Sequence, residues 1–146
     1  MTRFTFCIIA VFLCACVCPH ETAAADWTFV SNSGGFGLYY DKGNIKTLPD
    51  KVMSVGIKME PLTKATKDDF IRNMKGDDVH KRQLESFSYI IYLSEIKCSE
   101  KLHRTVSARF YNANGASLYS QDETSTWNAI RPDSIIESIY SVVCVK

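Results

Sequence analysis

Phe87 to Cys98 has the sequence FSYIIYLSEIKC, a run rich in β-branched and aromatic residues. Such residues favour extended strands, where their side chains pack well on a pleated surface. Every second side chain of a strand points to the same face. The pattern therefore predicts a long strand in which one face is formed by Ile90, Tyr92, Ser94, Ile96 and Cys98.

Two further strands are predicted after this one. Thr105 to Tyr111 has the residue types of a strand, and it ends at Asn112-Ala113-Asn114-Gly115. Asn and Gly accept the backbone angles of tight turns, so this segment is a hairpin signal. Ala116 to Gln121 then returns as the partner strand, and the centre of the domain is predicted to be an antiparallel meander.

Three strands are predicted before the central one. Asp26 to Ser31 and Phe36 to Asp41 flank Gly34-Gly35, which is typical of a hairpin turn. Lys51 to Glu60 alternates in the manner of a half-buried strand, with an apolar face made by Met53, Val55, Ile57 and Met59. The sheet is thus expected to contain about six antiparallel strands.

A short helix is predicted in the 66–76 region. Thr66 to Asp69 resembles a helix start, and an apolar stripe of Phe70, Ile71 and Met74 follows it. Lys75 to Glu85 mixes both signs of charge, which is typical of a solvated surface segment.

The C-terminal segment is predicted to be a second helix. Ser134 and Glu137 have the spacing of a capping box. Ile136, Tyr140 and Cys144 follow at intervals of four residues, so they share one helix face. The many β-branched residues lower helix propensity and leave a seventh strand as the alternative. The expected fold class is α+β, with this helix packed on the sheet.

Residues 1–25 are predicted to be a signal peptide. Arg3 precedes an apolar run from Phe4 to Val17, and Ala23-Ala24-Ala25 supplies the small residues that a signal peptidase requires. The run is shorter than the roughly 20 residues that cross a bilayer as a helix, so no transmembrane span is expected in the mature chain. The mature domain would then comprise residues 26–146. In the alternative, Leu13-Cys14-Ala15-Cys16 acts as a lipobox and Cys16 carries a lipid anchor.

Removal of the leader leaves two cysteines, Cys98 and Cys144, of the six in the chain. An exported protein folds in an oxidising compartment, where such a pair most simply forms one disulfide. Two free buried thiols are the alternative. With the C-terminal segment helical, the disulfide would connect that helix to the end of the central strand.

Composition and charge narrow the function classes. The chain has 146 residues, a one-domain length, and a formal net charge of +1, which does not suggest nucleic acid as a partner. Hydrophobic residues make up 46% of it and aromatic residues 12%, so it has the material for a folded core.

No residue pattern of catalysis or metal binding is apparent in the sequence. His80 and His103 lack partners at ligand spacing, and a role as surface histidines is expected for both. The carboxylate pairs Asp68-Asp69 and Asp77-Asp78 consist of adjacent residues, whereas glycosidase carboxylates face each other across a substrate. We therefore expect no enzyme activity, no metal and no cofactor.

A binding surface is the remaining source of function. Aromatic and basic side chains are concentrated on the predicted strands, and some of them must face solvent. The basic residues around the central strands are Lys97, Lys101, His103, Arg104 and Arg109. The candidate surface residues are Tyr39, Tyr40, Arg104, Arg109, Tyr111 and Tyr119.

An ordered series of short motifs carries a family resemblance. It consists of Trp27 with Tyr39-Tyr40-Asp41, the Ile90 to Cys98 run, Phe110 to Gly115, and Trp127 to Ser134 followed by Glu137, Tyr140 and Cys144. This series resembles the surface-adhesin protein E family of bacterial exported proteins. The resemblance implies a sheet of about six antiparallel strands with a C-terminal helix tied to it by a disulfide. The family takes its name from members that attach to host extracellular-matrix proteins.

Three functional hypotheses follow. The first is an exported, non-enzymatic adhesin-like module, periplasmic or at the cell surface, that recognises protein or envelope surfaces and forms homodimers through open sheet edges. The second is a small periplasmic enzyme or enzyme inhibitor with a pocket lined by tyrosines and by Arg104, Arg109 and Arg131. The third is a structural envelope protein.

Overall fold

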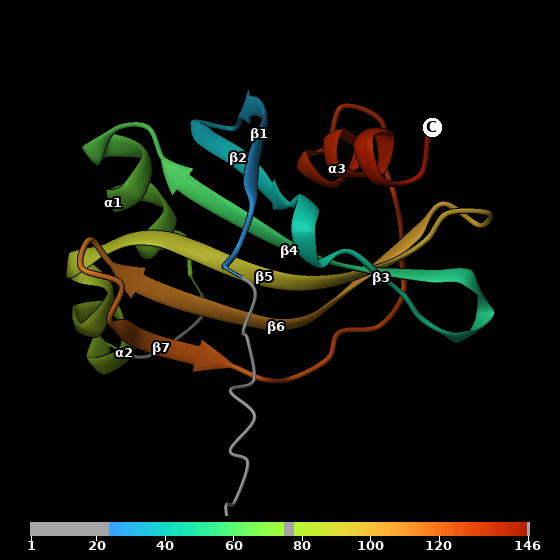
Figure 1. Cartoon of the computed structure of the whole chain (residues 1–146). Helices are drawn as coiled ribbons and strands as arrows, with labels where there is room; N and C mark the ends of the chain where they lie inside the picture. Colours follow the sequence, from blue (N-terminus) through green and yellow to red (C-terminus); the bar gives the residue numbers. More distant parts are fainter. Residues whose placement is uncertain (1–23, 75–77, 146) are drawn as a thin grey trace, which may run out of the picture.

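A computed structural model describes residues 24–74 and 78–145 (Figure 1). The predicted leader lies outside these residues, except for Ala24 and Ala25. The strands are β1 (Trp27–Ser33), β2 (Phe36–Asp41), β3 (Lys46–Thr47), β4 (Val52–Pro61), β5 (Phe87–Lys97), β6 (Leu102–Asn112), β7 (Ser117–Gln121) and β8 (Asn128–Ala129). The helices are α1 (Lys64–Asn73), α2 (Asp78–Gln83) and α3 (Ile135–Val143), with 3-10 turns at Lys42–Asn44, Pro49–Lys51 and Leu84–Ser86.

The sheet is antiparallel, and six strands form its main path in the order β1-β2-β4-β5-β6-β7. This confirms the predicted α+β class and the meander. The two-residue strands β3 and β8 pair with β4 and β6 and were not predicted, because two residues are too few to show alternation. The strand predicted from Thr105 begins earlier, at Leu102, where pairing with β5 and β8 extends it.

One face of the sheet carries the core. Tyr92 of β5 lies opposite Ile57 of β4 on one side and Ala108 of β6 on the other, so apolar residues of three strands meet on this face. α1 and α3 both pack on it, toward opposite ends of the sheet (Figure 1). Ile139 of α3 is fully buried, and Phe70 of α1 contacts both parts of the core. We call this side the covered face.

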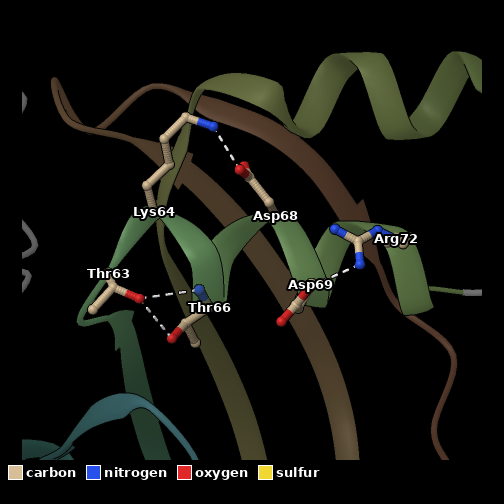
Figure 2. A network of polar contacts seen from close by, with 6 residues as sticks. All are labelled: Thr63, Lys64, Thr66, Asp68, Asp69 and Arg72. Carbon is tan, nitrogen blue, oxygen red and sulfur yellow. Dashed lines mark hydrogen bonds and ion pairs between the residues drawn. The ribbon is translucent and has the colours of Figure 1, made fainter.

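α1 begins earlier than the sequence indicates. Its N-cap is Thr63, whose hydroxyl accepts a hydrogen bond from the backbone N–H of Thr66 at 3.1 Å (Figure 2). The expectation of a start at Thr66 to Asp69 was therefore wrong by about one turn. The N-cap is the residue whose side chain accepts a hydrogen bond from a free backbone N–H of the first helical turn. Thr66 cannot be this cap, because its own N–H is one of the free donors. Ion pairs of Lys64 with Asp68 and of Asp69 with Arg72 run along the exposed side of the helix (Figure 2).

The segment Lys75 to Glu85 is not the plain surface excursion that its charges suggest. Residues 75–77 lie outside the described part, and α2 and a 3-10 turn follow. Leu84 has only 1% of its surface exposed and packs in the core with Phe87, Ile90 and Phe110. The two apolar residues of this segment, Val79 and Leu84, stand isolated among many charges and produce no periodic signal, so the sequence pattern did not reveal this anchor.

The C-terminal helix is confirmed, and the alternative of a seventh strand is wrong. Ser134 accepts a hydrogen bond from the backbone N–H of Glu137 at 3.3 Å, as a capping box requires. The Glu137 carboxylate reaches back one residue further than expected and accepts from the N–H of Asp133 at 2.6 Å. The helix ends at Val143, and Cys144 is its C-cap.

A disulfide connects Cys98 to Cys144, with a Cα–Cα distance of 5.5 Å. The predicted disulfide between the end of the central strand and the last helix is therefore confirmed, and the alternative of two free thiols is wrong. The Tyr140 hydroxyl adds a second link, because it donates a hydrogen bond to the Cys98 carbonyl at 3.2 Å.

Candidate binding surface on the uncovered face of the sheet

The face of the sheet opposite α1 and α3 is lined by aromatic, basic and apolar side chains. We call it the uncovered face. Phe29 of β1 is 54% exposed and Leu93 of β5 is 39% exposed, although both are large apolar residues in the middle of strands. Exposed apolar side chains that gather on one surface mark an interaction site more often than single exposed ones do.

At one end of this face, Lys58 contacts several aromatic rings. Its ammonium lies 4.6 Å from the ring centre of Tyr39, 5.6 Å from that of Trp27 and 5.7 Å from that of Tyr89. It also forms an ion pair with Glu60 at 2.8 Å. These contacts with β1, β2 and β5 come from strand register, since Lys58 of β4 lies directly opposite Tyr39 of β2. We call Lys58 and its rings the aromatic-lysine cluster.

Two ring pairs extend the aromatic-lysine cluster. Phe29 meets Tyr39 edge to face at 5.5 Å, and Tyr89 stacks on Tyr111 at 5.1 Å with an angle of 12° between the rings. Edge-to-face and offset-stacked geometries are those that aromatic pairs prefer. Each ring in these pairs therefore packs against a second ring, which restricts its orientation.

At the other end of the uncovered face, Trp127 contacts two basic side chains. Lys97 and Arg104 both lie over its ring, with their charged groups at 4.8 Å and 4.5 Å from the ring centre. Arg104 also contacts Glu95 through two nitrogens, at 2.6 Å and 2.7 Å from the same carboxylate oxygen. Arg109 pairs with Asp122 at 3.7 Å between the two ends. Leu93 belongs to the same face of β5 as Glu95, and it contributes apolar surface there.

A hollow of about 580 Å³ adjoins the aromatic-lysine cluster. It lies where α1 begins beside the start of β5, and its lining includes Glu60, Lys67, Phe87 and Tyr89. The Lys67 ammonium lies 5.6 Å from the Phe87 ring centre. The hollow thus joins the rings of the uncovered face to the basic first half of α1.

The predicted surface residues are divided between the two faces. Tyr39, Arg104, Arg109 and Tyr111 lie on the uncovered face, in or beside the contacts described above. Tyr40 and Tyr119 lie on the covered face and pack against its core. Tyr39 and Tyr40 are neighbours in the sequence and lie on opposite faces because side chains alternate along a strand.

Several residues of this surface were not among the predicted ones, namely Phe29, Lys58, Tyr89, Leu93 and Glu95. Alternation offered a signal for Lys58, since Val55, Ile57 and Met59 define the buried side of the same strand. What alternation could not give is the strand order that brings Trp27, Tyr39 and Tyr89 around it.

The remaining basic candidates lie elsewhere. His103 lines a hollow of about 310 Å³ with Arg131 and Ser134 at the start of α3, and burial lowers the pKa of His103. Lys101 lies over the ring of Tyr140, at 5.9 Å from its centre. Arg131 is therefore beside α3, whereas Arg104 and Arg109 are on the uncovered face, so the three arginines do not form the pocket that the enzyme hypothesis required. The side chains of Asp78 and His80, and all of Asp77, lie outside what the structure describes.

Tyr92 illustrates the difference between the two faces. It belongs to the covered side of β5 and packs against both parts of the core, and burial raises its pKa to about 12. Within residues 24–74 and 78–145, no three His, Cys, Asp or Glu side chains are grouped as metal ligands would be. The same residues contain no helix of the length and apolarity needed to cross a bilayer.

The fold and this surface define a small disulfide-linked domain that packs its helices on one face of an antiparallel sheet and presents rings and cations on the other. The family model for surface-adhesin protein E matches residues 27–145, and the chain belongs to this family. It is also similar to a crystal structure of Haemophilus influenzae protein E (crystal form II), with a TM-score of 0.53 and 9% sequence identity. That likeness covers 79% of this chain and 91% of the other, and it concerns the fold alone. No curated protein sequence matches the chain.

Proposed function

We propose that this chain is an exported, non-enzymatic adhesin-like module of the bacterial cell envelope, and that it binds protein surfaces through the uncovered face of its sheet. Membership of the surface-adhesin protein E family supports the general role. The observation that supports the location of the binding surface is the exposure of Phe29 and Leu93 on a face that also carries two groups of rings and cations. Aromatic and arginine side chains dominate the binding energy of protein interfaces.

The proposal includes a leader of residues 1–25 and a mature domain of residues 26–146, placed in the periplasm or at the cell surface. Acylation at Cys16 would instead attach the same domain to a membrane by a short tether. Homodimerisation also remains a proposal. β1 and β7 are the outer strands of the main sheet path, and such edges can pair with a second copy. Small-angle scattering over a range of concentrations measures this, and a monomer at every concentration contradicts the dimer.

Binding assays on a matched set of variants test the proposed surface. Residues 26–146 are purified and applied to immobilised extracellular-matrix proteins and to isolated envelope material, with heat-denatured domain as the reference. A Phe29→Ser/Leu93→Ser variant is compared with Val142→Ser, because Val142 of α3 is 39% exposed, as Leu93 is, but lies on the other side of the molecule. Unchanged circular dichroism and melting temperature show that each variant is folded.

We expect the double variant to bind at least tenfold more weakly, since truncation of an interface hot-spot residue costs about 2 kcal/mol or more. Val142→Ser is expected to bind as the wild type does. If the double variant binds as tightly as Val142→Ser and the wild type, the uncovered face is not the binding surface. A wild-type domain that binds nothing above the denatured reference would contradict the adhesin-like role itself.

A further inference from the structure

Asp41 is a buried carboxylate without a charged partner in the described part of the chain. It ends β2 and has 7% of its surface exposed. One carboxylate oxygen accepts a hydrogen bond from the backbone N–H of Asp26 at 3.0 Å, and the other accepts from the side-chain amide of Asn44 at 2.7 Å. Both donors are neutral. A buried carboxylate is costly unless a cation or several strong donors compensate it, so this group lacks an obvious source of positive charge.

The backbone of Asp26 is held in place beside this carboxylate. Its carbonyl accepts a hydrogen bond from the N–H of Lys42 at 3.0 Å, which pairs it with the residue that follows β2. A Cβ atom at Gly43 would lie 3.3 Å from the Cβ of Asp26, so a side chain at position 43 would crowd it. Asp26 therefore occupies a defined position, with its nitrogen directed at Asp41.

The nitrogen of Asp26 is also the atom that leader removal would change. Signal peptidase hydrolyses the bond between Ala25 and Asp26, and the new carboxylate stays on Ala25. The Asp26 nitrogen becomes an α-amino group, which is mostly protonated at neutral pH. The neutral donor would thereby become a cation at the same position, 3.0 Å from a buried carboxylate oxygen.

We propose that Asp41 is the binding site for the α-ammonium of the processed N-terminus, so that cleavage after Ala25 completes a partly buried ion pair and stabilises the folded domain. This inference rests on the leader removal proposed above, and it adds a structural consequence to it. A chain that keeps its leader, or is cut at Cys16, retains a neutral amide at Asp26 and lacks the pair.

Four chains in a thermodynamic cycle test the site. Residues 26–146 with a free N-terminal Asp26 are compared with residues 24–146, in which Ala24-Ala25 keep the Asp26 nitrogen an amide. Each is made with Asp41 and with Asp41→Asn, which has nearly the same shape and no charge. Urea titration gives the unfolding equilibrium constant of each chain, and the cycle isolates the pairwise effect.

We expect the extension to increase the unfolding equilibrium constant about tenfold in the Asp41 background, because charge-assisted hydrogen bonds are roughly twice as strong as neutral ones. In the Asp41→Asn background we expect no change. An equal effect of the extension in both backgrounds would overturn the proposal.

Chemical acetylation keeps the proposal testable if Asp41→Asn does not fold. Acetylation of the α-amino group of residues 26–146 removes the charge and leaves one N–H, so it should destabilise the domain as much as the extension does. The same reaction on residues 24–146 modifies Ala24 and should have no effect. A domain of unchanged stability after acetylation of Asp26 would refute the ion pair.

The processing step has its own measurement, which is independent of binding to matrix or envelope material. Intact mass spectrometry of the exported chain should show a start at Asp26. A start at any other residue, including a lipid-modified Cys16, would overturn the role of cleavage even where the cycle shows coupling.

Discussion

Replacement of both disulfide cysteines, Cys98→Ala/Cys144→Ala, is expected to destabilise the domain strongly and α3 first. The two cysteines are separated by 46 residues. In the chain-entropy model, opening a loop of that length frees the unfolded chain enough to cost about 4 kcal/mol at 25 °C. For a domain of this length the melting temperature should fall by about 15 °C.

The structure also predicts where the loosening begins. Cys144 is the C-cap of α3, and its N–H donates to the Tyr140 carbonyl at 2.8 Å. Ile139 is fully buried, so its apolar contacts still hold the middle of the helix without the disulfide. The last turn should therefore fray while the first two remain.

Calorimetry and amide hydrogen exchange measure both effects. The melting temperature is compared between the wild type under non-reducing conditions, the wild type in a phosphine reductant, and the double variant. The last two should agree, and amides at residues 142–144 should exchange faster than those at 139–141. Equal melting temperatures for the oxidised wild type and the variant would refute the entropic argument, and loss of stability without faster exchange in α3 would refute the proposed location.

Three further perturbations test the fold and its ionisation. Ile139→Ala should lower the free energy of unfolding in urea by about 3 kcal/mol because it leaves a cavity under α3. Val142→Ala, on the exposed side of the same helix, should lower it by less than about 0.5 kcal/mol. Similar values for the two variants would mean that the helix is not packed as described. Thr63→Ala should cost about 1 kcal/mol through loss of the N-cap of α1, and Thr63→Ser should restore most of it; no recovery with serine would contradict the cap. Burial lowers the pKa of His103 in the folded protein. As the pH falls, the imidazole is therefore protonated more readily in the unfolded chain than in the folded one. The free energy of unfolding should then decrease as the pH drops below about 6.5. A melting-temperature series from pH 7.5 to 5 should show this fall reduced in His103→Gln, and an identical profile would exclude a contribution from His103.

The strands and the last helix could be derived from the sequence because each depends on local pattern. Alternation in Phe87 to Cys98 and in Lys51 to Glu60 reports burial on one face directly. The Ser134 and Glu137 spacing reports a helix start, because capping is a contact between residues three apart. The errors fell where a single contact determines the outcome, at the Thr63 cap and at the buried Leu84.

The candidate binding surface could be predicted only in part from the sequence. Of six predicted residues, the uncovered face holds Tyr39, Arg104, Arg109 and Tyr111, while Tyr40 and Tyr119 lie on the covered face and pack against the core. A tyrosine on a strand has the same residue type whichever way it points, so type alone could not distinguish the two sets. Register distinguishes them, because it fixes which face each position occupies.

The sequence by itself determined that this chain forms an antiparallel sheet with a terminal helix and one disulfide, since periodicity, capping and cysteine number are properties of the chain read locally. Only the tertiary structure decided that Lys58 lies among the rings of Trp27, Tyr39 and Tyr89, and that the nitrogen of Asp26 lies against Asp41. The physical reason is that such contacts join residues in or next to different strands. Their geometry depends on strand order and register, which the packing of the whole core selects.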